Sequence, residues 1–92
     1  MIFDWHDAKS ERNLEQRGFG FDFAATIFLG RTLESVDGRH DYGEVRVKAI
    51  GETQGVILVV IYTDRREVRW IVSARVANRK ERALWQESHW KS

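Results

Sequence analysis

The sequence contains no cysteine and no proline. Without cysteine there can be no disulfide framework, no thiolate zinc site and no cysteine nucleophile. The longest apolar run, residues 56–62, is far shorter than the roughly twenty residues that span a membrane. The N-terminal segment MIFDWHD has acids where a secretory signal needs cations followed by an apolar stretch. These absences predict a cytoplasmic protein with no membrane partner.

The composition that remains is typical of a globular protein. Hydrophobic residues make up 42% of the 92 residues, and the aromatic residues include 4 Trp and 5 Phe. Such a chain can bury one modest core, but it is too short for two. We therefore predict a single domain over residues 1–92, with no room for a second, cofactor-binding lobe.

Charge is unevenly distributed along the chain, although the formal net charge is only +1. Residues 1–44 hold five Lys and Arg against nine Asp and Glu, whereas residues 65–82 hold seven against two. The basic segment could attract a polyanion, and the acidic segment could meet a basic partner. The alternative is a lattice of solvated ion pairs between the two segments.

The first part of the chain has helical periodicity. Residues 2–5 alternate and indicate a turn or a brief strand, and residues 7–17 predict a helix that ends at Gly18. Residues 22–29 predict a second helix, capped by Asp22 and apolar nearly all round, which suits a core helix.

From residue 32 onward the period becomes that of strands. The expected strands cover residues 32–36, about 44–50, 56–63 and 68–74. Their connections are so short that neighbours must be antiparallel. Asn78 and Glu81 resemble a capping box that opens a last helix. The predicted fold class is therefore α+β, with two N-terminal helices, an antiparallel sheet of three or four strands and a C-terminal helix.

Several kinds of active site find no support in the sequence. His6, His40 and His89 lie far apart and form no i, i+4 pair, so we expect no metal site. No glycine-rich phosphate loop and no serine elbow motif occur, and no cofactor is expected.

A set of Arg, His and Glu residues remains as candidate chemistry. Arg75 ends a strand, where a rigid guanidinium can bind a phosphate with two hydrogen bonds. Arg46 follows a loop that carries His40 and Glu44, and an imidazole suits proton transfer at neutral pH. Such a set can cleave RNA without a metal, because the ribose 2′-OH is an internal nucleophile. In the alternative interpretation Arg75 pairs with an acid such as Glu81, and His40 is an ordinary loop residue.

The start of the last helix is basic, where helix dipoles favour acids. Arg79, Lys80 and Arg82 follow closely after Arg75. Backbone N–H groups and cations that converge in this way make an anion site, which predicts phosphate binding. Charge and spacing do not say whether that phosphate is cleaved or only held.

Four segments in order resemble the BrnT toxins of type II toxin–antitoxin operons, which are similar in fold to RelE and ParE toxins. The first segment matches the N-terminal pattern of that family at Phe3, Trp5, Asp7, Lys9 and Asn13, followed by Gly18 and Phe21. The second segment matches the middle pattern of the family at Asp37, Arg39, His40, Gly43, Glu44 and Arg46. The third segment covers residues 59–65. The last segment matches the family at Ile71, Ser73, Ala74, Arg75, Ala77, Glu81 and Arg82.

The resemblance implies a ribosome-independent ribonuclease that arrests growth. Together with the lack of a metal motif, it predicts a metal-independent endoribonuclease. It also implies a BrnA-type antitoxin with a ribbon-helix-helix domain, a complex of two toxins and two antitoxins, and contact with operator DNA only through the antitoxin. The chain departs from the family pattern in two places. Gln16 and Arg17 replace Lys-His at the end of the first helix, and His6 replaces an Asp.

The candidate site residues fall into two groups. The expected catalytic residues are Arg75, Arg46, His40, Glu44 and Lys9. The expected RNA-binding residues are Arg79, Lys80, Arg82, Arg17 and Arg69. Two further functions stay open, a non-enzymatic ParE-like toxin that binds a protein target and a degenerate toxin that acts only as a corepressor.

Overall fold

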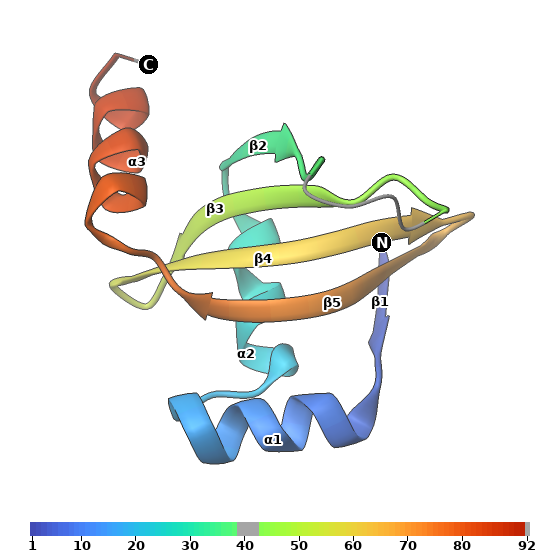
Figure 1. The fold of residues 1–92 in the computed structure, drawn as a ribbon. Helices are drawn as coiled ribbons and strands as arrows, with labels where there is room; N and C mark the ends of the chain where they lie inside the picture. The colour runs from blue at the N-terminus through green and yellow to red at the C-terminus, as the bar shows by residue number, and fades with distance from the viewer. Residues whose placement is uncertain (39–42, 92) are drawn as a thin grey trace.

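The computed structural model describes residues 1–38 and 43–91, with side chains as far as Ser88. Its centre is a five-stranded sheet in the order β1-β5-β4-β3-β2 (Figure 1). The strands are β1 (Ile2–Trp5), β2 (Thr32–Val36), β3 (Val47–Thr53), β4 (Val56–Arg65) and β5 (Val68–Val76). The helices are α1 (Asp7–Arg17), α2 (Phe21–Ala25), the 3-10 helix η1 (Thr26–Leu29) and α3 (Arg79–Lys91). No helix in these described ranges is long and apolar enough to cross a membrane.

The predicted fold class was wrong. Residues 2–5, expected as a turn or a brief strand, join the sheet as a fifth strand, and the sheet is mixed because β1 lies parallel to β5. Their register joins Ile2 to Val68 and Trp5 to Ile71. Four alternating residues cannot reveal a partner that lies 66 positions further along the chain, and short connections indicate only antiparallel neighbours. Strands therefore dominate this fold, and the helices are few.

The second predicted helix was also wrong in its details. The α-helical part begins at Phe21 after Gly20 and ends at Ala25, and the chain then tightens into η1. Asp22 lies in the first turn of α2 and does not cap it. Tightening of this kind is common near the end of a helix.

The strand boundaries differ as well. Strand β3 starts at Val47, later than expected, and runs on to Thr53. Gln54 and Gly55 alone connect it to β4, with φ values of 48° and 80°. Positive φ at both positions is typical of a two-residue hairpin turn. The expected strands left residues 51–55 as the connection, which was therefore too long.

The two faces of the sheet are covered differently. Helix α2 and η1 lie behind the sheet in Figure 1, where Phe21, Ala24 and Ile27 pack on the main core. Gly51 allows the close approach of η1, because a Cβ atom there would lie 2.8 Å from Cβ of Ile27. On the other face a smaller cluster forms around Trp85 of α3. This face also carries the site described next.

Candidate functional site

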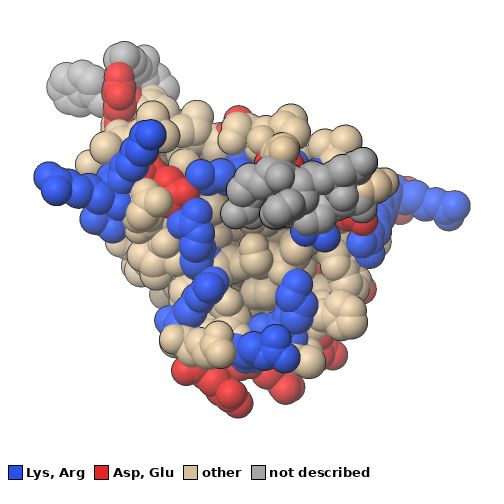
Figure 2. All heavy atoms as spheres, viewed as in Figure 1, with Lys and Arg blue, Asp and Glu red and all other residues tan. Residues whose placement is uncertain are grey.

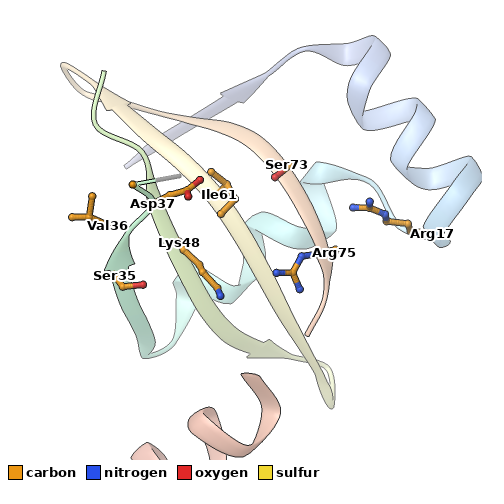
Figure 3. A pocket seen from close by; sticks show the side chains of 9 residues that line it. Arg17, Ser35, Val36, Asp37, Lys48, Ile61, Ser73 and Arg75 are labelled. Atoms are coloured by element: carbon orange, nitrogen blue, oxygen red, sulfur yellow. The ribbon is translucent and has the colours of Figure 1, made fainter. Parts of the chain in front are cut away.

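A hollow of about 460 Å³ lies on the face of the sheet that also packs against Trp85 (Figure 3). It is lined by residues from β2 to β5 and from the end of α1. They are Arg17, Ser35, Val36, Asp37, Gly38, Lys48, Ile61, Ser73 and Arg75. Three of these side chains are cations and one is a carboxylate. The hollow therefore suits an anionic ligand.

Two of the cations come from strands on either side of β4. In Figure 3 the side chains of Lys48 on β3 and Arg75 on β5 point toward each other. Both project from the same face as Ile61, since alternate residues of a strand share a face. They are held partly exposed, at 34% for Lys48 and 40% for Arg75.

One buried carboxylate holds both cations. Glu81 accepts two hydrogen bonds from Arg75, of 2.7 and 2.8 Å, and its Oε2 lies 2.7 Å from Nζ of Lys48. It also accepts from the backbone N–H of Asn78, whose side chain caps the N–H of Glu81, each at 2.9 Å. The predicted capping box is thus confirmed, and Arg75 pairs with Glu81 as the alternative interpretation of the sequence expected.

The environment of Glu81 keeps it ionised. The hydrogen bonds from Arg75 contribute most to lowering the pKa of this carboxyl, followed by those from Lys48 and Asn78, while burial opposes them. Glu81 is only 4% exposed. Two cations share one anion, so the cluster keeps a net positive charge at the edge of the hollow.

Arg17 adds the third cation from the end of α1. Its Nη1 donates to the carbonyl of Ala74 at 2.6 Å and to Oδ1 of Asn13 at 3.4 Å. Asn13 is buried and donates in turn to the carbonyl of Phe19 at 2.9 Å. These contacts join α1 to β5 and fix the guanidinium at the edge of the hollow. Gly18, in the left-handed conformation with φ of 86°, ends the helix directly after it.

Asp37 supplies the carboxylate among the lining residues. It follows β2, it is buried, and its N–H donates to the carbonyl of Arg46 at 2.7 Å. The hydroxyls of Ser35 and Ser73 line the same hollow. Neither Asp37 nor Lys48 was among the predicted site residues. Alternation along the strand indicates only that Lys48 shares a face with Arg46, and strand pairing through β4 is what brings it near Arg75. Asp37 gave no signal outside the motif.

Two predicted residues lie away from this hollow. Glu44 pairs with Arg65 at 3.0 Å, and this hydrogen bond lowers the pKa of the Glu44 carboxyl. Arg69 makes two hydrogen bonds to Asp64 and lies 4.0 Å from the ring centre of Tyr62, on the face that packs against η1. Neither is brought together with Arg75.

The remaining predicted residues do not line this hollow or fall outside the described ranges. Arg46 precedes β3 and is not among the lining residues. Arg79 and Lys80 are exposed on the first turn of α3, where Arg82 donates to the carbonyl of Ala77 at 2.9 Å. Lys and Arg side chains gather over the sheet, α1 and the start of α3 in Figure 2. His40 lies outside the described residues, and Lys9 lines a second hollow on α1.

Within the described ranges, His, Asp and Glu residues form no group of three or more that could hold a metal ion. The three cations and the carboxylate of the hollow are instead the kinds of side chain that bind a phosphodiester and transfer a proton.

Comparison with known protein families gives one match over most of the chain. The model of a family described as ribonuclease toxin, BrnT, of type II toxin–antitoxin system matches residues 5–81. No curated protein matches the chain. The matched residues include β1 from Trp5 onward, all of the sheet that follows, and the start of α3 as far as Glu81.

Proposed function

We propose that this chain, which belongs to the BrnT family of ribonuclease toxins of type II toxin–antitoxin systems, cleaves RNA without a metal in the hollow between Lys48, Arg75 and Asp37. The single observation that carries the proposal is the pair of cations that Glu81 holds at the edge of this hollow. A phosphodiester carries one negative charge, and that charge increases as the transition state forms. Donors fixed in advance stabilise such developing charge most effectively.

The reaction needs only groups that the chain can supply. The ribose 2′-oxygen attacks the adjacent phosphorus and loses its proton to a base, and the bond from phosphorus to the 5′-oxygen breaks as an acid protonates that oxygen. The products are a 2′,3′-cyclic phosphate and a 5′-hydroxyl. Lys48 and Arg75 would bind the non-bridging oxygens.

For the base we propose Asp37. Its carboxylate lines the hollow beside Lys48 and Arg75, whereas Glu44 lines a different hollow. His40 follows Asp37 by three positions in the sequence and stays a candidate for the acid. Arg17 would bind the phosphate from the side of α1.

Membership of a type II system implies an antitoxin partner. We propose a BrnA-type antitoxin with a ribbon-helix-helix DNA-binding part, in a complex of two toxins and two antitoxins. An acidic segment of this antitoxin would cover the basic surface around Arg75 and Arg79, since charge complementarity there excludes RNA directly.

Incubation of the purified protein with RNA in a metal chelator tests the proposed reaction. We expect cleavage products that end in 2′,3′-cyclic phosphate. Cleavage should be much slower in Arg75→Ala and unchanged in the control Arg66→Asn, which likewise removes one positive charge but lies on the β4–β5 turn, where φ is 59° and Asn is well tolerated. Intact RNA together with growth arrest on expression would contradict the proposal and favour a protein target.

A further inference from the structure

A second, smaller hollow of about 150 Å³ lies between α1 and β5. It is lined by residues from three elements. They are Lys9, Arg12, Asn13, Gln16 and Arg17 of α1, Phe21 of α2, and Val72 and Ser73 of β5. Arg17 and Ser73 also line the larger hollow, so the two hollows adjoin each other at these residues.

The charges of α1 are separated between two sides of the helix. At 3.6 residues per turn, Lys9, Arg12 and Arg17 fall on one side, and this side faces the smaller hollow. The acids Asp7, Glu11 and Glu15 fall on the opposite side, and none of them lines the hollow. Red atoms gather along the outer margin of α1 in Figure 2. The smaller hollow is therefore cationic, above an apolar floor.

Arg17 lies at the junction of the two hollows. Its described hydrogen bonds, to Ala74 and Asn13, both use Nη1, which leaves Nη2 able to donate to a phosphate. The helix rises 1.5 Å per residue, so Lys9 lies about 12 Å along its axis from Arg17. A nucleic-acid strand bound across Lys48 and Arg75 could thus continue along α1 for more than one nucleotide.

We propose that the α1 side, defined as Lys9, Arg12 and Arg17, binds the phosphates that flank the cleaved phosphodiester. The proposal rests on the function proposed above and assigns Lys9 to substrate binding instead of catalysis. Arg12, which sequence reasoning did not single out, belongs to this subsite. Interactions of this kind fix the position of the strand and affect all sequences alike.

The test separates binding from cleavage. A labelled 2′-O-methyl RNA of about ten nucleotides lacks the nucleophilic 2′-hydroxyl and reports affinity alone. Lys9 and Arg12 are exposed, so the double variant Lys9→Ala/Arg12→Ala should fold normally. We expect it to weaken binding about tenfold and to lower the salt slope by about 0.7 for each phosphate that the variant no longer neutralises. Arg66→Asn is the control: it removes one positive charge on the β4–β5 turn, away from α1, and should change little.

A dinucleotide that competes with this RNA locates the subsite. It should fill only the larger hollow, so the double variant should bind it as the unchanged protein does, while Arg75→Ala should bind both ligands more weakly. An unchanged affinity of the double variant for the longer RNA would overturn the proposal. An equal weakening for the dinucleotide, or a weakening confined to antitoxin binding, would overturn it too. None of these results depends on cleavage, so this inference can fail while the proposed function holds, or the reverse.

Discussion

Arg75 and Glu81 are joined by two hydrogen bonds of 2.7 and 2.8 Å, one to each carboxylate oxygen. The carboxylate is almost fully buried, while the guanidinium stays 40% exposed toward the hollow. Lys48 binds the same carboxylate from a different strand. A structural ion pair and a phosphate site, which are alternatives on sequence grounds, are therefore compatible here. The buried acid orients two cations that it does not neutralise completely.

The first prediction concerns Glu81→Gln. The amide keeps the size of the side chain but removes the charge, and its NH₂ group would face a cation. Loss of one partner from a buried pair costs about 3–5 kcal/mol, and the partial exposure of Arg75 and Lys48 reduces our expectation to about 2 kcal/mol. Urea unfolding measures this cost. Glu67→Gln, on the exposed β4–β5 turn, is the control and should stay within about 0.5 kcal/mol.

The second prediction concerns pH. The pKa of Glu81 in the folded protein lies well below its ordinary value of 4.5, mainly because Arg75 donates to the carboxylate. Its contribution to stability is therefore complete above about pH 4.5 and is lost as the pH falls toward the folded-state pKa. We expect the free energy of unfolding of the unchanged protein to fall more steeply below pH 4.5 than that of Glu81→Gln. If the free energy of unfolding fell equally with pH in the two proteins, Glu81 would not be the group responsible.

The third prediction concerns the attachment of α3. Trp85 is 6% exposed, its Nε1 donates to Glu52 at 3.2 Å, and Arg31 lies 4.4 Å from its ring centre. Truncation of a buried Trp costs about 3–5 kcal/mol. We expect Trp85→Ala to be destabilised by about that much in urea unfolding. Leu84→Ala, on the exposed side of the same helix, should be destabilised by less than about 1 kcal/mol.

Local patterns predicted some of these features and missed others for identifiable reasons. The capping box of Asn78 and Glu81 lies within four residues, so the sequence shows it directly. The ion pair of Glu81 with Lys48 joins positions 33 residues apart, and no local pattern reports it. Strand β1 was missed as a member of the sheet for the same reason. The same holds for the residues that line the hollow. Arg75 and Arg17 were among the candidate site residues, whereas Asp37 was not, because only the fold brings it to the same hollow.

Single-turnover cleavage by Arg75→Ala at saturating RNA tests the central claim most directly. If Arg75 stabilises the transition state, the rate should fall by about 10²- to 10³-fold, which is usual for the loss of one such donor. Arg79→Ala, on the exposed first turn of α3, is the control and should leave this rate nearly unchanged. Thermal melts show whether each variant is folded, and Arg75→Lys keeps the charge of Glu81 compensated if Arg75→Ala unfolds. The account predicts slow cleavage by a folded Arg75 variant. Cleavage at the unchanged rate by both Arg75→Ala and Arg75→Lys would contradict it.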